Sequence, residues 1–335
     1  MIACLYGRDF APFVEPVVRD LRTAAAAVGG EIQPLTIEAA LAQPHRRADV
    51  HRLYVLPFDL PDAAAASHAS PATAIRALFP RAEVVTSFAV QDLCWDKVAT
   101  EERLLDRGVP VPETLMSTDP AEVVAFVRKH RFAILKERYS CGGQGHVVLW
   151  IEDGRIVGDS GSHRYTVDLT ANGRREIRDD RLIYPGPFYV QRLIVDIGPR
   201  SVLPAQLLRA YVVDNQIGFW TERYRDRCMR PSDWIINVSL GAKYRFVLSV
   251  SEEVRKIALR TAEVIGMRIG VVDIIRTASS GSYVLEVDTD SHHMIIDRQF
   301  KEIPEYRDFF DLDRYIADAL LVEPEPQPRR AVSEF

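Results

Sequence analysis

The sequence predicts an α/β protein in which a small parallel α/β domain precedes a longer α+β region. In residues 1–92, short apolar strands alternate with helical segments, which is typical of a parallel sheet covered by helices. Two later segments, residues 134–151 and 269–288, each place two apolar strands around a turn, which indicates antiparallel hairpins. The 335 residues, of which 47% are hydrophobic and 27% charged, suffice for two or three domains.

Composition excludes several classes of protein. The formal net charge of -5 and the lack of long Lys/Arg blocks argue against a nucleic-acid partner. No apolar run has the roughly 18 residues that a membrane span needs, and the first residues do not form a secretory signal, so a cytoplasmic location with no membrane partner is expected. Four cysteines occur without a CxxC pair, which predicts neither a zinc site nor a disulfide framework: Cys4, Cys94, Cys141 and Cys228.

The N-terminal domain begins with a predicted strand over residues 1–6, followed by a predicted helix over residues 14–28 that Gly29 closes. Further buried strands are predicted over residues 53–58 and 83–87. Ligands of open parallel sheets bind beyond the carboxyl ends of the strands, so Arg8, directly after the first strand, is a candidate substrate contact. The alternative is an ordinary surface loop.

A second region begins at about residue 93 with a charged helix over residues 97–107, which ends at Gly108 and runs into Val-Pro-Val-Pro. Another helix begins at Asp119, with Pro120 in its first turn and Glu122 expected to bond back to the cap. Later, residues 153–181 are charged and weakly periodic, and we expect a single hairpin there.

Residues 134–151 combine a strand that ends at Lys136, a glycine-rich turn and a second strand. Three glycines lie between the strands: Gly142, Gly143 and Gly145. A Walker loop or a Rossmann fingerprint would open a helix, and none follows here. Because glycines let the backbone approach an anion closely, the hairpin is a candidate cover for phosphate, and its turn is expected to order when a nucleotide binds. The alternative is an ordinary glycine-rich hairpin.

A strand over residues 188–194 and an irregular connector to residue 204 precede a predicted hairpin around Asp214-Asn215. Arg209 and Arg223 lie within or at the ends of its strands and indicate an anion site, with a solvated basic edge as the alternative. Ser249 and Glu252 then predict a capping box for a helix that Gly266 closes.

The hairpin of residues 269–288 carries acidic residues in apolar strands. If its loop has an even length, centred between Ser279 and Ser280, Asp273 lies opposite Glu286, and alternation puts Asp288 on the same face. Two carboxylates about 5 Å apart repel by roughly 3 kcal/mol at an effective dielectric of 20, so a divalent cation is the simplest compensation. The alternatives are an exposed face or an ion pair with a nearby arginine.

These motifs occur in the order found in a known family. A DK helix followed by GVPVP, a lysine strand with a glycine loop, a VQR connector, an arginine hairpin and a D…EVD hairpin make the chain resemble the ATP-grasp carboxylate-amine ligases. The resemblance covers roughly residues 92–320 and is strongest to the branch with ribosomal-protein glutamate ligases, glutathione synthetases and D-alanyl-D-alanine ligases. It implies an ATP-grasp fold after an N-terminal parallel α/β domain, with ATP bound between two lobes.

The resemblance also implies roles for particular residues. Phosphate contacts are expected from Lys97, Lys136, Gly142, Gly143 and Gly145. Contacts to the rest of the cofactor are expected from Gln191, Arg192, Leu193 and Asn237. The arginines expected to neutralise the transferring phosphate, and so to be catalytic, are Arg209 and Arg223. The expected ligands of Mg²⁺, with Mn²⁺ as the alternative metal, are Asp273, Glu286 and Asp288.

The implied reaction phosphorylates a carboxylate with ATP, after which an amine displaces phosphate to form an amide or peptide bond. The expected partners are small-molecule or peptide carboxylates and amines, and the family allows a homodimer. The expected domains are residues 1–92, lobe A over 93–188, lobe B over 189–320, and a disordered tail over 321–335.

The chain departs from the family pattern at several positions. Asp288 stands where an Asn is usual, and Arg192 stands where an acid is usual. The segment after the acidic hairpin contains His292 and His293 in place of a small loop, which makes both histidines candidate substrate contacts, with packing as the alternative. An ATP-grasp kinase that phosphorylates a small molecule, and a nucleotide-binding regulatory module without turnover, are the alternative functions.

Overall fold

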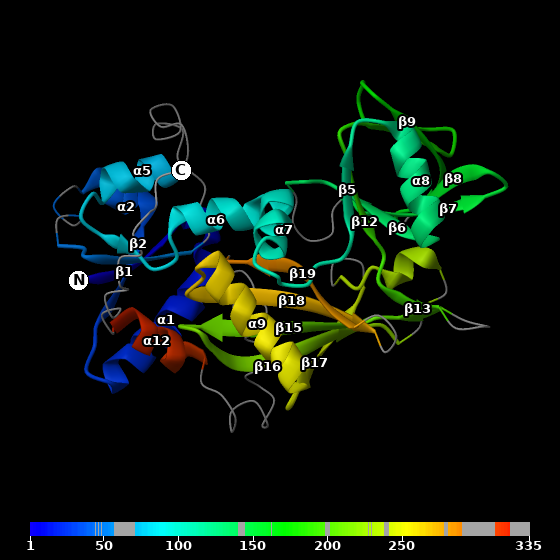
Figure 1. Cartoon of the computed structure of the whole chain (residues 1–335). Coiled ribbons are helices and arrows are strands. Elements are labelled where there is room, and N and C mark those ends of the chain that lie inside the picture. The colour runs from blue at the N-terminus through cyan, green and yellow to red at the C-terminus, as the bar shows by residue number, and fades with distance from the viewer. Residues whose placement is uncertain are drawn as a thin grey trace. The chain divides into compact units, whose positions relative to one another are not determined.

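The computed structural model describes residues 1–43, 45, 47, 49–56, 71–139, 145–161, 163–197, 202–226, 228, 230–237, 241–277, 281–289 and 312–321. The chain forms two units (Figure 1). The first unit consists of Met1–Phe88 together with Asp290–Phe335, and the second is Ala89–Thr289.

The first unit contains a four-stranded sheet in the order β2-β1-β3-β4. Its strands are β1 (Ile2–Tyr6), β2 (Ile32–Thr36), β3 (Arg52–Val55) and β4 (Glu83–Val84). All three pairings are parallel, which confirms the predicted parallel sheet. β2 was not predicted. β3 and β4 are shorter than expected: β3 ends at Val55 and β4 ends at Val84.

The described helices of this unit are α1 (Ala11–Ala27), α2 (Ile37–Ala42), α5 (Pro71–Leu78) and α12 (Leu312–Leu321), with a 3-10 turn η1 (Arg8–Phe10) before α1. α1 begins three residues before the predicted start, and Gly29 follows it with a φ of 78°. Apolar side chains of the sheet and helices form one core, which includes Leu5, Leu53 and Ile75.

The C-terminal helix α12 belongs to this first unit. Leu321 packs so closely on Gly30 that a Cβ there would lie 2.3 Å from a leucine methyl carbon. The guanidinium of Arg52 donates a hydrogen bond of 2.5 Å to the carbonyl of Leu320. The structure thus groups α12 with the first unit, whose interior its apolar face enters, whereas the expected boundaries assigned residues up to 320 to lobe B.

The second unit contains an eight-stranded sheet in the order β10-β11-β9-β8-β7-β6-β12-β5. Its strands are β5 (Thr114–Ser117), β6 (Ala133–Lys136), β7 (Val147–Glu152), β8 (Arg155–Asp159), β9 (Arg164–Thr170), β10 (Glu176–Arg178), β11 (Arg181–Pro185) and β12 (Phe188–Arg192). β6 and β7 pair antiparallel, which confirms the hairpin of residues 134–151. Residues 153–181 do not form the single hairpin that we expected, since strands β8 to β11 extend the sheet and β9 pairs parallel with β11.

Helix α8 (Pro120–His130) packs on this sheet through Val123 and Val127. The Asp119 carboxylate caps the helix by accepting a hydrogen bond from the Ala121 N–H, as predicted. Glu122 does not bond back to the cap, because its carboxylate accepts the Ser117 hydroxyl at 2.5 Å instead.

A second, five-stranded sheet of this unit has the order β17-β16-β15-β18-β19 and is antiparallel throughout. Its strands are β15 (Gln206–Val213), β16 (Gln216–Tyr224), β17 (Lys243–Val247), β18 (Ile269–Thr277) and β19 (Gly281–Asp288). The β15–β16 turn is at Asp214 and Asn215, both with positive φ, as the sequence predicted. Along the chain between β12 and β15, the segment expected to be irregular contains a small antiparallel pair of strands, β13 (Val195–Ile197) and β14 (Val202–Pro204).

Three helices pack on the five-stranded sheet: α6 (Phe88–Trp95), α7 (Lys97–Leu105) and α9 (Glu252–Ile265). Leu104 of α7 and Ala258 of α9 share a core with β15 and β18. The cap of α9 is Ser251, whose hydroxyl accepts from the Val254 N–H, so the predicted cap at Ser249 was two residues too early. Gly266 closes α9 in the left-handed conformation, as expected.

None of the helices in the described part of the chain is long and apolar enough to cross a membrane.

Candidate functional site

A cavity of about 660 Å³ lies within the second unit, between residues of its two sheets. Most of the site residues that the sequence predicted line it: Lys97, Lys136, Gln191, Arg192, Leu193, Arg223, Asn237, Asp273 and Glu286. Apolar side chains, among them Ile134, Trp234 and Ile275, form the remainder of the wall together with His146. The fold therefore gathers side chains from positions 97 to 286 around one space with both charged and apolar walls.

Asp273 and Glu286 lie directly opposite each other on β18 and β19, as predicted. The route to this pairing differs from the predicted one. Thr277 pairs with Gly281 across an odd turn of residues 278–280, so the loop is not even. Ile274 pairs with Val284 and Asp273 with Glu286, which leaves Leu285 as an extra residue in a β-bulge. The bulge restores the opposition that the turn alone would have removed.

Asp273 is held by two arginines of the neighbouring strands. Nε and NH2 of Arg209 donate to Oδ1 and Oδ2 of Asp273, each at 2.7 Å, and Arg209 is only 1% exposed. NH1 of Arg223 lies 3.4 Å from Oδ2 of Asp273. The Nε of Arg223 is buried and has no hydrogen-bond partner among the described residues. Arg223 thus presents an unsatisfied donor at the wall of the cavity.

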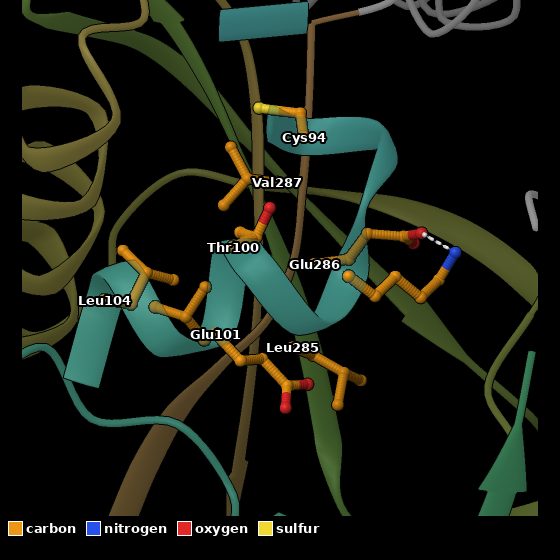
Figure 2. Close-up of a pocket in the computed structure, with 9 residues that line it drawn as sticks. Cys94, Thr100, Glu101, Leu104, Leu285, Glu286 and Val287 are labelled. Atoms are coloured by element: carbon orange, nitrogen blue, oxygen red, sulfur yellow. Dashed lines mark ion pairs between the residues drawn. The ribbon is translucent and has the colours of Figure 1, made fainter. Parts of the chain in front are cut away.

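Lys97 lies at the start of α7, which Asp96 caps through the N–H groups of Val98 and Ala99. Its Nζ lies 3.6 Å from Oε1 of Glu286, the ion pair that the dashed line in Figure 2 marks. The view is centred on a smaller pocket of about 270 Å³, where α7 covers Leu285 and Val287 of β19. Helix α7 therefore places its first residue, Lys97, in contact with Glu286 of the acidic hairpin.

Lys136 is the last residue of β6 and is buried. Its Nζ donates a hydrogen bond of 2.6 Å to Oε1 of Gln191 on the paired strand β12. Burial lowers the pKa of Lys136, while the charges of Glu101 and Glu286 act in the opposite direction. Lys136 is a buried cation at the wall of the cavity.

The sequence analysis missed Glu101, which lies one helical turn after Lys97 on α7. Its buried carboxylate accepts three hydrogen bonds, from the Tyr189 hydroxyl at 2.5 Å, Nε2 of Gln191 at 2.6 Å and the Thr114 hydroxyl at 2.8 Å. The spacing of Glu101 and Leu104 on a helix could have indicated a buried acid, because residues three apart share a face.

His146 was also missed. It follows Gly145 and lines the cavity, and both of its ring nitrogens are buried with no hydrogen-bond partner among the described residues. Burial, and then the positive charges of Lys136 and Lys97, lower the pKa of His146 to about 3, so the imidazole is neutral. Gly145 itself has a φ of 76°, a conformation that favours glycine.

Four further predicted site residues belong to the described part of the chain but are not among the residues that line the cavity: Arg209, Gly145, Asp288 and Arg8. Asp288 lies opposite Val271 at the end of β19 and is outside the lining as described. Arg8 is exposed in the first unit, where its backbone N–H donates to the Glu38 carboxylate at 3.2 Å. Four candidates lie outside the described residues: Gly142, Gly143, His292 and His293. The expected ordering of the glycine turn falls largely on the same undescribed residues.

The predicted convergence of three carboxylates is not found among the residues that the structure describes, where no group of three potential metal ligands occurs. Arg209 donates to both oxygens of Asp273, so an arginine compensates this carboxylate in the structure, which is one of the alternatives given in the sequence analysis. The donor chemistry of Asp273 and Glu286 nevertheless suits Mg²⁺, which prefers carboxylate oxygens and completes its shell with water and phosphate.

Comparisons with known proteins agree with this architecture. The model of the RimK-like ATP-grasp domain family matches residues 203–303. The tetrahydromethanopterin:alpha-L-glutamate ligase of Methanocaldococcus jannaschii is 25% identical over 198 residues, which are 59% of each chain. The chain thus spans well under two thirds of the length of this curated relative.

Solved structures resemble the chain over nearly its whole length. A Chryseobacterium gregarium RiPP-associated ATP-grasp ligase, in complex with ADP and a leader and core peptide, has a TM-score of 0.61 at 14% identity and covers 95% of this chain and 96% of its own. The ATP-grasp ligase PsnB, complexed with minimal precursor, Mg and ADP, has a TM-score of 0.57 at 17% identity, with coverage of 95% and 96%. The chain has the fold of these ATP-grasp ligases, as its motifs predicted, and its residues 203–303 resemble the RimK-like ATP-grasp domain.

Proposed function

We propose that this chain is an ATP-dependent carboxylate-amine ligase that activates a carboxylate as an acyl phosphate and joins it to an amine, releasing ADP and phosphate. The observation that carries the proposal is a cavity to which both sheets contribute cations, with a connector strand and two opposed carboxylates beside them. Phosphoryl transfer from ATP needs such an arrangement, because its catalysis consists mainly of positioning the reactants and of neutralising negative charge.

Each group has a role in this proposal. Lys97 and Lys136 bind the phosphates of ATP, and Arg209 and Arg223 neutralise the phosphate that is transferred. The unsatisfied Nε of Arg223 supports this role, since it is a buried donor without a partner among the described residues. Gln191, Arg192, Leu193 and Asn237 line the part of the cavity where the apolar side chains of Trp234 and Ile275 suit an adenine ring.

Asp273 and Glu286 are the proposed ligands of Mg²⁺, with Mn²⁺ as the alternative, and Asp288 is a less favoured third ligand because it lies outside the described lining. When bound, the metal would offset the charge of the ATP phosphates. Lys97 would then turn from Glu286 towards phosphate, because the metal would take over the neutralisation of that carboxylate.

The substrate class is a small-molecule or peptide carboxylate together with an amine. The name of the Methanocaldococcus jannaschii relative indicates a glutamate ligase, the Chryseobacterium gregarium ligase was solved with a leader and core peptide, and PsnB was solved with a minimal precursor. These observations support an amino acid or a peptide as one of the two substrates of this chain.

The test is a screen for ADP release over pairs of amino acids, peptides and polyamines with ATP and Mg²⁺, read by mass spectrometry. The proposal expects a product lighter by one water than its two precursors combined, and a hydroxamate when hydroxylamine replaces the amine. Lys136→Ala and Glu286→Gln should abolish turnover, whereas Lys243→Ala, which changes an exposed lysine paired with Asp226, should not. A phosphorylated product that forms no hydroxamate would instead indicate a kinase, and ATP binding without ADP release from any pair would indicate a regulatory module.

A further inference from the structure

Lys136 differs in its counter-charge from three other cations of the candidate site, Lys97, Arg209 and Arg223. Lys97 pairs with Glu286, and Arg209 and Arg223 pair with Asp273. Within the described part of the chain, no carboxylate forms an ion pair with Lys136, although the lysine is buried. A buried ammonium is costly without a nearby negative charge, so its compensation has to come from somewhere else.

The nearest compensating charge in the network is the Glu101 carboxylate, which is linked to Lys136 by hydrogen bonds through the side-chain amide of Gln191. Gln191 accepts from Lys136 through Oε1 at 2.6 Å and donates to Glu101 through Nε2 at 2.6 Å. The chemistry of the two ends dictates this orientation, because an ammonium only donates hydrogen bonds and a carboxylate only accepts them. Gln191 is completely buried, so the amide has no water to bond with instead. The side chain therefore acts as a spacer that keeps Glu101 out of direct contact with Lys136.

The Glu101 end of this chain of hydrogen bonds is itself held in place. The Tyr189 hydroxyl and the Thr114 hydroxyl donate to the same carboxylate from β12 and β5. Burial, followed by the neighbouring Glu101 charge, raises the pKa of Tyr189 well above its usual value, so the phenol keeps the proton that it donates. The centroid of the Tyr189 ring also lies 5.9 Å from Nζ of Lys136. The carboxylate has little freedom to move towards the lysine.

From this geometry we infer that Glu101 is a positioning residue for ATP, which holds Lys136 charged and aimed into the cavity by acting across Gln191. A direct Glu–Lys pair would compete with phosphate for the ammonium, whereas a counter-charge one amide away stabilises the charge and leaves donors of Lys136 for the phosphate. Because Lys136 contacts phosphate only if the proposed function is right, the inference rests on that function.

The inference predicts how the affinity for ATP depends on pH. The charged and titratable groups that face Lys136 come from three elements and from the residue before β7: Glu101 and Lys97 of α7, Glu286 of β19, Tyr189 of β12 and His146. Burial lowers the pKa of Lys136 and the Glu101 charge opposes this effect. Replacing Glu101 by a neutral group therefore lowers the pKa of Lys136 further, and the ammonium loses its proton at a lower pH.

The experiment measures the binding of AMPPNP with Mg²⁺ by calorimetry from about pH 6.5 to about pH 10, for the wild type, Glu101→Gln, Glu101→Asp and Glu102→Gln. In Glu101→Gln we expect affinity within about threefold of the wild type at the acidic end, and an alkaline loss of affinity that begins about one pH unit lower or more. Glu101→Asp keeps the charge and should restore the position of the alkaline loss. Glu102→Gln changes the exposed neighbour on α7 and should match the wild type throughout.

Two outcomes would overturn the inference while leaving the proposed function intact. One is a Glu101→Gln profile that coincides with the wild type, and the other is an equal weakening at every pH, which a merely structural role would cause. A wild type that does not bind AMPPNP would instead contradict the proposed function. If Glu101→Gln does not fold, Gln191→Met serves as the second variant, because it keeps the length of the side chain and removes both hydrogen bonds. It should weaken binding about tenfold or more, and wild-type affinity in this variant would refute the spacer role of Gln191.

Discussion

Arg209 binds Asp273 through two parallel hydrogen bonds of 2.7 Å across the β15–β18 pairing, and both side chains are almost completely buried. The pair places a carboxylate and a guanidinium in the interior of the second unit, next to Arg223. The folded protein needs both partners of this pair, because removing one leaves the other as an unpaired charge in a low-dielectric interior, which is strongly unfavourable. The candidate site is therefore also a determinant of stability.

The variant Arg209→Met should destabilise the protein by about 3–5 kcal/mol, because it removes two short hydrogen bonds from the buried Asp273 carboxylate, whose contact to Arg223 is longer. Urea unfolding followed by circular dichroism measures this loss. The matched control is Arg268→Met, which breaks a two-bond pair with Asp214 that is partly exposed and should cost about 1 kcal/mol or less. Equal losses in the two variants would contradict the argument from burial.

The neutral His146 predicts acid sensitivity. Its pKa is about 3 in the folded chain, against 6.5 as the ordinary value, so the unfolded chain binds more protons between these limits. The contribution of the neutral His146 to the free energy of unfolding is complete above about pH 6.5 and is lost as the pH falls towards about 3. About 2 kcal/mol of it is lost by pH 5. His146→Phe should thus lose less stability on acidification than the wild type.

Urea midpoints at about pH 7.5, 6 and 5 measure this difference. His163→Phe, which removes an exposed imidazole stacked on Tyr165, is the control for the loss of a histidine. Parallel acid profiles for the wild type and His146→Phe would show that His146 is accessible to protons in the folded chain.

Glu286→Gln separates the two roles proposed for this carboxylate. Glu286 pairs with Lys97 at 3.6 Å, so the neutral amide removes a competitor for the phosphates. We expect the affinity for ATP without metal to rise by about twofold to fivefold, and the gain in affinity on adding Mg²⁺ to disappear. Calorimetry with EDTA and then with Mg²⁺ measures both effects. Glu263→Gln, on the exposed side of α9, is the control, and an unchanged Mg²⁺ response in Glu286→Gln would rule out Glu286 as a metal ligand.

Gly270→Ala tests the close packing at the end of the acidic hairpin. A Cβ at Gly270 would lie 2.4 Å from Sδ of Met267 and 2.5 Å from the carbonyl oxygen of Asp288. The methionine can move but the backbone carbonyl is fixed in the strand, so we expect a loss of about 1–3 kcal/mol in the free energy of unfolding. The double variant Gly270→Ala with Met267→Ala should recover only part of it. Full recovery would mean that the side chain, and not the Asp288 backbone, causes the strain.

Local patterns in the sequence predicted the hairpins and the members of the cavity. Period-two alternation placed Asp273 and Glu286 on apolar strands, and turn residues such as Asp214 and Asn215 marked where the strands reverse. The opposition of the two acids was predicted correctly with an incorrect loop, because the bulge at Leu285 compensates for the odd turn. A bulge is decided by packing across the whole sheet, which a pattern within one hairpin does not contain.

Local strand periodicity and turn chemistry in the sequence by itself determined the α/β class and the hairpins, and the order of the motifs suggested Lys97, Lys136, Gln191 and Glu286 as site residues through the family resemblance. Only the tertiary structure decided which charge neutralises which. It paired Arg209 with Asp273, placed Glu101 behind Gln191 and Lys136, and joined α12 to the first unit. The physical reason is that ion pairs, buried networks and helix docking depend on distances between residues that are far apart in the chain, and only folding sets these distances.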